Sequence, residues 1–180
     1  QISGYLRLSI PPAMTVWWEL LAQFQQRYPG IRLFVQTTER RVDLVADGID
    51  VALRVGAIEH ETMVAKRVIS WRHQLVAAPS LVERYGRPQS PADLSRYPCA
   101  VWNASAWRPS VWSLGGETVH PAAILMTNDY AHLYQRVLSG DVISELPPFM
   151  VNEDIAQGRL VGLLEDYPLP EQHIHLVYPP

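Results

Sequence analysis

The strongest constraint in this sequence is the order in which short β-type runs alternate with amphipathic helical runs. Residues 6–10 alternate apolar and polar side chains, which is the period of a strand, and a Pro-Pro pair follows them. Over residues 14–28 apolar side chains recur at helical spacing, and a Pro-Gly pair closes that run. Residues 31–35 are again β-rich. This order predicts parallel βαβ units with right-handed crossovers, and therefore an α/β protein. The predicted buried face of the helix consists of Trp17, Leu20, Leu21, Phe24 and Tyr28.

Similar patterns continue along the chain. A short helix is expected after Thr37 and Thr38, with Val42, Val45 and Ala46 facing inward and Gly48 at its end. Residues 49–56 are mostly apolar, as a strand buried on both faces would be. A second amphipathic helix is expected to begin at a cap on Thr127 or Asn128 and to end at Gly140. The other expected elements are strands at 64–69, 74–78, 97–102, 124–126, 142–146, 159–164 and 173–178, a short capped helix from Ser90, a hairpin at 114–117 and a helical turn at 155–156.

Charge and hydropathy exclude several classes of protein. The 180 residues carry 15 Lys and Arg against 18 Asp and Glu, a net charge of −3, without any block of like charge. A phosphate backbone requires a basic face, so this segment alone is a poor nucleic-acid binder. Its apolar runs are far shorter than the roughly 18–20 residues that cross a bilayer, and no secretory leader opens it. The single Cys99 excludes an internal disulfide and fits a reducing compartment, so we expect a soluble cytoplasmic protein with no membrane partner.

The sequence offers no catalytic constellation. It contains no G-x-S-x-G elbow, no glycine-rich phosphate loop and no C-x-x-C pair. His173 and His175 share one face of an expected strand, but no third ligand lies nearby, and a zinc site needs three or four. Structural histidines are therefore favoured over ligands. We expect neither an enzyme nor a bound metal or cofactor.

Three junctions between a strand and the following segment are the best candidates for a binding site. In open α/β sheets, ligands collect where the carboxyl ends of strands meet helix N-termini, whose free N–H groups suit a carboxylate or another acceptor. These junctions are residues 12–15, Thr37 with Thr38, and residues 127–129. Trp102 and Asn103, just past a strand, add a stacking face and an amide. At any single position a helix cap is the simpler interpretation, but three such junctions together favour a ligand-binding cleft.

The chain resembles the effector-binding domain of LysR-type transcriptional regulators over nearly its whole length. Each segment that carries the resemblance is a weak motif alone, but their order and spacing are specific. They are GYLRLS at 4–9, FQQRYPGI at 24–31, DLVADGIDVALRVG at 43–56, LVAAP at 75–79, SPADL at 90–94, ELPPF at 145–149 and GRLV at 158–161.

The resemblance implies two Rossmann-like lobes, as in type 2 periplasmic binding proteins, joined by crossing hinge strands. Lobe I would comprise residues 1–75 and 166–180, and lobe II residues 76–165, with a small effector in the cleft between them. The family's DNA-binding winged helix-turn-helix has no counterpart here, so we expect it upstream. The family dimerises through its first helix and the helix of lobe II, which marks Trp17, Trp18 and Gln25 as interface candidates. The effector contacts it implies fall on Pro12, Ala13, Met14, Thr37, Thr38, Arg54, Trp102, Asn128 and Asp129.

Two questions stay open at the level of sequence. Helix N-termini favour an anionic effector such as a carboxylate, whereas Asp129, Asp141 and Glu145 oppose one. In addition, the family's usual G-x-G-I turn reads Gly140-Asp141-Val142-Ile143 here, so the second glycine is lost and the Asp141 carboxylate is placed near the expected cleft. The predicted function is effector sensing that controls DNA binding and transcription by a full-length homodimer or tetramer. The alternative is a solute-binding protein or a free-standing ligand-binding module.

Overall fold

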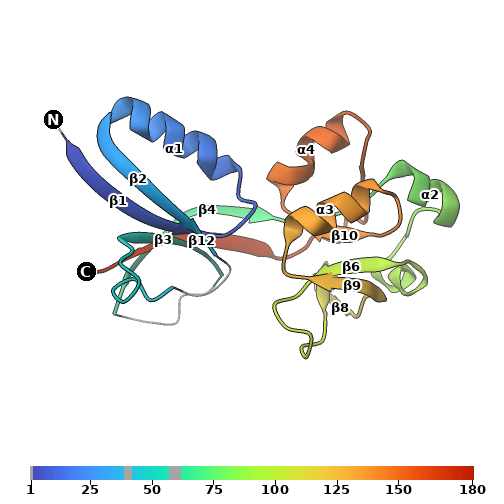
Figure 1. Ribbon diagram of the computed structural model, residues 1–180. Coiled ribbons are helices and arrows are strands. Elements are labelled where there is room, and N and C mark those ends of the chain that lie inside the picture. The colour runs from blue at the N-terminus through green and yellow to red at the C-terminus, as the bar shows by residue number, and fades with distance from the viewer. Residues whose placement is uncertain (1, 39–41, 57–61) are drawn as a thin grey trace. The chain divides into compact units, whose positions relative to one another are not determined.

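A computed structural model describes residues 2–38, 42–56 and 62–180 of the chain (Figure 1). Its contacts divide the chain into two compact units. Unit 1 consists of residues 1–70 and 172–180, and unit 2 consists of residues 71–171. The lobe boundaries predicted from the sequence are 75/76 and 165/166. The chain passes from one unit to the other within strands β4 (Val64–Arg72) and β12 (Glu171–Tyr178), which are the crossing strands of the predicted two-lobed fold.

Unit 1 is built on a mixed sheet with the strand order β2-β1-β3-β12-β4. Strand β1 pairs in parallel with β2 and with β3, so the predicted parallel βαβ unit is confirmed. Strand β12 returns antiparallel to β3. The elements that form this sheet and its helix, besides the two crossing strands, are β1 (Ser3–Ile10), α1 (Val16–Arg27), β2 (Gly30–Thr37) and β3 (Val51–Val55).

Helix α1 lies along β1 and β2 in Figure 1, yet none of its residues is fully buried. Trp17, Leu21 and Phe24 are half-buried, as the helical spacing predicts. Leu20, which was assigned to the same face, is 46% exposed, and Trp18 is 60% exposed. The helix therefore presents apolar side chains on more than the face turned to its own sheet.

The segment after residue 41 corrects the prediction of a short helix. Residues 39–41 lie outside the described residues, and from Val42 onward the chain makes one turn, with Asp47 N–H donating to Asp43 O at 2.9 Å. Val42 is buried as expected, but Val45 is 74% exposed and Ala46 is also exposed. A single turn has no second turn on which to repeat a buried face, so periodicity misassigned these residues.

Strand β3 corrects a second expectation. Ala52 is buried against the turn segment, but Val55 is 44% exposed, so the strand is not buried on both faces. The core of unit 1 around this strand is small and consists of Val42, Leu44, Ile49, Ala52 and Val177, with Met63 packed against it.

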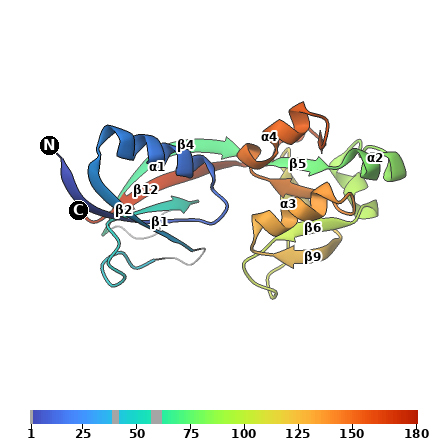
Figure 2. The same cartoon turned by 45° about the horizontal axis from the view of Figure 1, so that its top comes forward.

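Unit 2 packs two apolar clusters on opposite faces of the antiparallel sheet β10-β5-β11. On β5, Leu75 and Ala77 face one cluster, while Val76 faces the other, as the period of two requires. Figure 2 shows β5 among the helices of this unit. The remaining strands form the parallel pair β6–β9 and the hairpin β7–β8. The strands of unit 2 are β5 (Gln74–Ala77), β6 (Cys99–Trp102), β7 (Trp112–Leu114), β8 (Glu117–Val119), β9 (Ala123–Thr127), β10 (Ser144–Leu146) and β11 (Val161–Gly162).

The helices of unit 2 are partly as predicted. Helix α3 (Tyr130–Leu138) buries Leu133 and Val137 on the expected face and ends at Gly140, whose φ is +86°. The 3₁₀ helix η1 (Pro91–Arg96) begins with the expected capping box of Ser90 and Asp93. Helix α2 (Pro79–Tyr85) was not predicted, and α4 (Pro148–Ala156) is longer than the expected turn. Both begin at a proline that directly follows or lies close behind a predicted strand, and proline is favoured at the first helical position. No described helix is long and apolar enough to span a membrane.

Candidate functional site

The carboxyl ends of parallel strands bring two predicted junctions of unit 1 together. Ile10 is in register with Thr37, the last residue of β2. Thr38 N–H continues the ladder by donating to Ile10 O at 3.1 Å. Residues 12–14, which follow β1, are therefore next to Thr37 and Thr38 at the carboxyl ends of these two strands. We call these adjacent strand ends the shared edge, and they are the candidate site of unit 1.

The turn from β1 into α1 has an unusual backbone. Ala13 has φ of +61°, in the left-handed region that non-glycine residues rarely adopt, and Met14 beside it is 4% exposed. The helix then starts with tight bonds from Trp17 N–H to Met14 O and from Trp18 N–H to Thr15 O, both 3.1 Å. The Thr15 side chain makes no capping hydrogen bond. The positive end of the α1 dipole thus carries no side-chain cap of its own.

Arg54 lies on β3 and is half-buried. Its Nη2 donates to Val42 O at 2.5 Å, so the guanidinium holds the turn segment against the strand.

In unit 2, strands β6 and β9 end side by side, with Trp102 in register with Thr127. The indole N–H of Trp102 donates to Asn128 O at 2.9 Å, and its ring stacks on Tyr130 at 5.9 Å with an interplanar angle of 17°. The predicted residues Trp102, Asn128 and Asp129 are thus brought together, with one indole face already covered by Tyr130.

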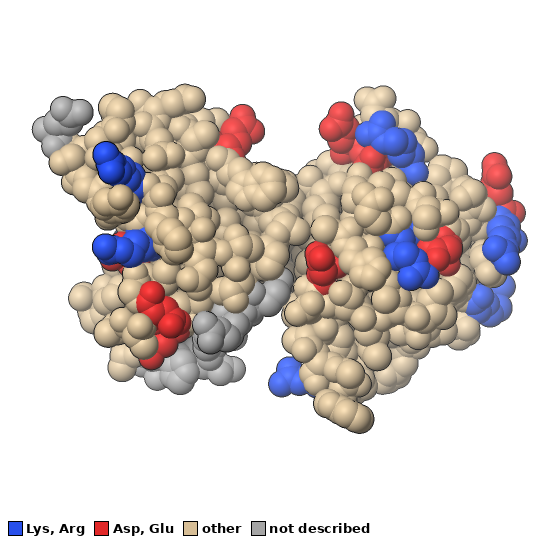
Figure 3. Space-filling view, in the orientation of Figure 1, with Lys and Arg blue, Asp and Glu red and all other residues tan. Residues whose placement is uncertain are grey.

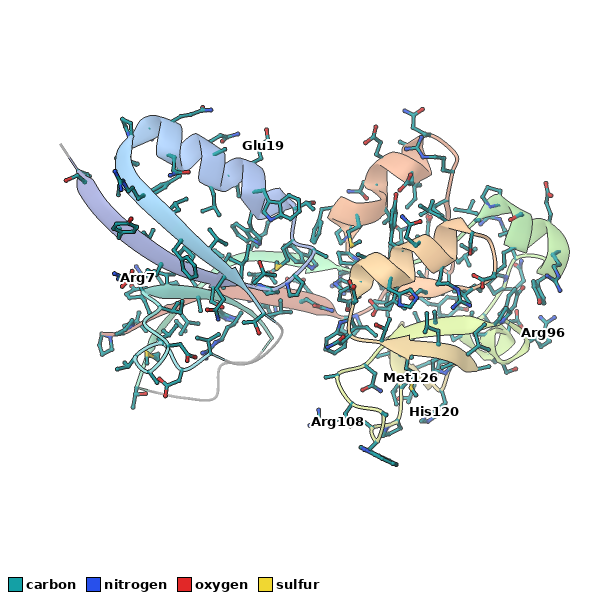
Figure 4. All side chains as sticks on the ribbon, viewed as in Figure 1. Arg7, Glu19, Arg96, Arg108, His120 and Met126 are labelled. Atoms are coloured by element: carbon teal, nitrogen blue, oxygen red, sulfur yellow. The ribbon has the colours of Figure 1, made fainter. Side chains whose placement is uncertain are left out.

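Asn103 is engaged in closing its own loop. Its Nδ2 donates to Arg108 O at 2.9 Å and to Ser110 Oγ at 3.2 Å, and its Oδ1 accepts from Ser105 N–H at 3.0 Å. Both amide hydrogens are therefore used within the loop that carries Arg108 (Figure 4). Only the second lone pair of Oδ1 remains for a ligand.

The cap of α3 corrects the expected one. Asp129, rather than Thr127 or Asn128, is the N-cap, and its Oδ1 accepts from Ala131 N–H at 2.9 Å. The carbonyl of Asp129 accepts from the N–H groups of His132 and Leu133. Because a carboxylate already occupies the positive end of this helix, the α3 terminus disfavours an anionic ligand.

The expectation that the Asp141 carboxylate lies near the effector contacts is also wrong. Its carboxylate accepts from Arg136 at 2.6 and 2.9 Å and from Ser139 Oγ at 2.9 Å, beyond the C-terminal end of α3. The candidate residues of unit 2 lie at the other end of that helix, which at 1.5 Å per residue is about 13 Å away. The hydrogen bonds from Arg136 lower the pKa of Asp141, so its charge is neutralised locally.

Sequence reasoning missed a chain of side chains behind Trp102. Tyr130 stacks on Trp102, and its ring meets the edge of His73 at a centroid distance of 5.3 Å. His73 Nδ1 in turn bonds Glu145 Oε2, and the Tyr130 hydroxyl lies 3.4 Å from Glu145 Oε1. His73 is 6% exposed. No sequence pattern identifies His73, because it lies between β4 and β5 and belongs to neither strand.

The two histidines considered as metal ligands have other surroundings. His173 Nδ1 lies 2.7 Å from Ser70 Oγ and 3.2 Å from Arg67 Nη1, whereas His175 Nδ1 is buried without a hydrogen-bond partner. Within the described ranges, no three His, Cys, Asp or Glu side chains are placed to hold a metal ion.

A two-unit α/β fold with candidate contacts at the strand ends defines a ligand-binding class of domain. A family model described as the LysR substrate binding domain matches residues 1–180, and the chain belongs to this family.

The relatives and solved structures agree with this assignment. The chain is 30% identical over 99% of its length to an uncharacterized HTH-type transcriptional regulator, YhjC, of Escherichia coli K12, and it covers 62% of that protein. It is 31% identical over 97% of its length to the HTH-type transcriptional activator AaeR of the same strain and covers 58% of it. The regulatory domain of CrgA, a LysR-type transcriptional regulator from Neisseria meningitidis, superposes with a TM-score of 0.86 at 26% identity. That superposition covers 98% of this chain and 89% of the other. The chain thus spans about six tenths of the length of these curated relatives.

Proposed function

We propose that this chain is the sensor of a transcriptional regulator that binds a small-molecule effector, and that the strand ends described in each unit are its candidate contact residues. The observation that carries the proposal is the shared edge in unit 1, where the Thr38 N–H bond to Ile10 O sets residues 12–14 beside Thr37 and Thr38. The family supports it, because its domain is described as substrate binding. The named relatives are regulators, which favours this function over solute transport.

The electrostatics of the two helix ends favour an orientation in which an acceptor group of the effector faces α1. The N-terminus of α1 has no side-chain cap, and the carboxylate in its first turn is Glu19, whereas the N-cap of α3 is itself the Asp129 carboxylate. An acceptor group such as a carboxylate would therefore bind at residues 12–15. In unit 2, Asp129, Asn128 and the Trp102 ring would suit donor groups and an apolar surface.

The wider role belongs to the longer protein. The relatives are named HTH-type regulators, and we propose that DNA contact is made by a part of such a protein outside these residues, acting in the cytoplasm. The charge of this chain fits that division, because its net charge is −3. The face shown in Figure 3 carries scattered charges of both signs and no continuous basic area.

A thermal-shift screen of small aromatic and aliphatic acids, paired with their neutral amides, tests the sensing proposal. Acids are expected to raise the unfolding temperature more than the matched amides. Thr38→Val removes a hydroxyl at the site and is expected to weaken the best acid about tenfold. Thr118→Val, which alters an exposed threonine on β8, is the control and should leave binding unchanged. Equal binding by wild type and Thr38→Val would remove Thr38 from the site, and preference for the amides would contradict the proposed orientation.

We also propose that the chain forms a homodimer through α1. Trp18 is 60% exposed on this helix, and Gln25, whose Nε2 donates to Ile31 O at 3.2 Å, is exposed on the same side seven residues further on. Leu20 is 46% exposed on the opposite flank of the helix. Trp17 is half-buried against the sheet and lies at the edge of this surface. Large aromatic side chains are typical anchors of protein interfaces.

A further inference from the structure

Unit 2 contains a pocket of about 290 Å³ that none of the predicted effector residues lines. It opens beside the residues that join β4 to β5. Its apolar wall is formed by Leu75, Leu114, Leu163 and Leu169, which are core residues on one side of β5. Tyr130 and Trp102 pack against the cluster on the other side of that strand, so this pocket and the unit 2 effector residues lie on opposite faces of the sheet.

Two charged side chains of opposite sign line the same pocket. Arg72 donates from Nη1 to Leu169 O at 2.8 Å, its Nη2 lies 3.5 Å from Glu171, and its side chain is 51% exposed. Glu165 accepts from Gln74 Nε2 at 3.4 Å and is exposed. A guanidinium has five donors and a carboxylate about four acceptor positions, so each group retains capacity for a ligand.

A third polar group in the pocket wall is buried. His73 has only 6% of its surface exposed, and Glu145 holds its Nδ1. Because Glu145 engages Nδ1, Nε2 is the other ring nitrogen of this buried side chain. The edge of the same ring contacts Tyr130, which stacks on Trp102. His73 therefore links this pocket to Tyr130, the side chain that supports the Trp102 indole.

We propose that this pocket is a second ligand site, and that it binds a free amino acid with an apolar side chain. Arg72 would meet the carboxylate, Glu165 the ammonium group, and the leucine wall the side chain. A ligand with one charge alone could form an ion pair with only one of Arg72 and Glu165. The volume of the pocket fits such a ligand. An engineered cavity of about 150 Å³ holds benzene, so a pocket of about 290 Å³ has room for a phenyl ring together with an amino-acid backbone.

Backbone strain at the wall of the pocket supports the assignment. Leu164 lines the pocket and has φ of +51°, a conformation that costs free energy for a branched side chain. Such strained residues concentrate at ligand contacts. Leu164 separates the leucine wall from Glu165, so its conformation sets the direction of the carboxylate.

Isothermal titration calorimetry with three matched probes tests the proposal. L-Phenylalanine carries both charges, 3-phenylpropanoate lacks the ammonium group, and 2-phenylethylamine lacks the carboxylate. Wild type is expected to bind phenylalanine about tenfold more tightly than either analogue. Arg72→Gln should abolish the advantage over phenylethylamine, and Glu165→Gln the advantage over phenylpropanoate. Arg72→Lys keeps the charge and should largely retain the preference.

Arg87→Gln is the matched control, because Arg87 also donates to a backbone carbonyl, that of Gly162 at 3.3 Å, but does not line this pocket. Leucine-methyl NMR spectra locate the ligand, and the resonances of Leu114, Leu163 and Leu169 should shift. Equal affinity for the three probes, no binding at the solubility limit of phenylalanine, or unshifted resonances of Leu114, Leu163 and Leu169 on binding would overturn the proposal. Thr38→Val should leave phenylalanine binding unchanged, which separates this site from the proposed effector site.

Discussion

At the scale of single residues, backbone strain marks the candidate site of unit 1. Ala13 and Leu164 are the non-glycine residues with positive φ in the part of the chain that the structure describes. That conformation raises the free energy of the folded chain by about 1–2 kcal/mol at each residue. Ala13 lies where β1 turns toward α1, so its strain sets the direction of the backbone at the proposed effector contact.

Ala13→Gly is expected to stabilise the chain by about 0.5–1 kcal/mol. Glycine adopts positive φ without the steric cost, which outweighs its larger entropy in the unfolded chain. The midpoint of urea unfolding should therefore rise. Ala22→Gly, at an exposed position inside α1, is the control and should lower stability by about 1 kcal/mol. A fall of both midpoints would show that Ala13 is not strained in solution.

Cys99 is expected to be unreactive in the folded protein. It is fully buried, and burial raises the pKa of its thiol to about 12. The reactive thiolate is therefore scarce at ordinary pH. A thiol reagent such as 5,5′-dithiobis(2-nitrobenzoate) at pH 8 should label the chain only after unfolding in urea. Rapid labelling without denaturant would contradict the burial.

At the scale of elements, periodicity predicted the long amphipathic elements and failed on the short ones. Helices α1 and α3 repeat a face over several turns, so their spacing identified them. The turn at Val42 and helix α2 are too short to repeat one. Positions that follow from topology, such as the shared ends of β1 and β2, were therefore predictable from the sequence.

Side-chain partners in the candidate site were not predictable in the same way. Thr127, Asn128 and Asp129 are three successive residues that can all cap a helix, and only the path of the backbone selects Asp129. Asn103 was expected to offer an amide to a ligand, but the loop that follows it uses both amide hydrogens. The contact of His73 with Glu145 joins residues 72 positions apart, which no local pattern encodes.

Asp154 connects helices α3 and α4, and Asp154→Asn is expected to destabilise the chain by about 1–3 kcal/mol at neutral pH. Its carboxylate is 5% exposed and accepts from the Tyr134 hydroxyl at 2.5 Å and from Arg159 Nε at 2.6 Å. Replacing one oxygen by an amide leaves a buried donor without a partner. Urea unfolding measures the loss. Glu153→Gln, at the exposed neighbouring position on α4, should change stability little.

The same carboxylate makes stability depend on pH. Burial alone would raise the pKa of Asp154, but the hydrogen bonds from Tyr134 and Arg159 outweigh it and hold the pKa below its ordinary value. Such a group stabilises the folded state fully above its unfolded pKa of about 3.9, and the contribution is lost as pH falls through the lowered folded value. The deficit of Asp154→Asn relative to wild type should therefore shrink when unfolding is measured at progressively lower pH below about 4. A constant deficit would show that the carboxylate is not ionised in the folded protein.

At the scale of the whole molecule, the division into two units is set by where the cores form. Unit 2 has a cluster on each face of its central sheet, whereas the cluster identified in unit 1 is small and its helix α1 has no fully buried residue. A helix whose apolar side chains are only half covered gains stability when a second surface buries them. This asymmetry is the reason to place the proposed dimer contact on unit 1.

Trp18→Glu is expected to convert a dimer of this chain into a monomer in sedimentation-velocity experiments. A stable interface buries about 800 Å² on each partner, and a charge placed at an aromatic anchor must be desolvated on association. The matched control is Trp107→Glu, which introduces the same charge at a tryptophan that is 94% exposed in the loop of unit 2. Because Trp18 is exposed in the single chain, the substitution should leave the unfolding temperature of the monomer nearly unchanged. A dimer that survives Trp18→Glu, or that is lost equally with Trp107→Glu, would move the interface away from α1.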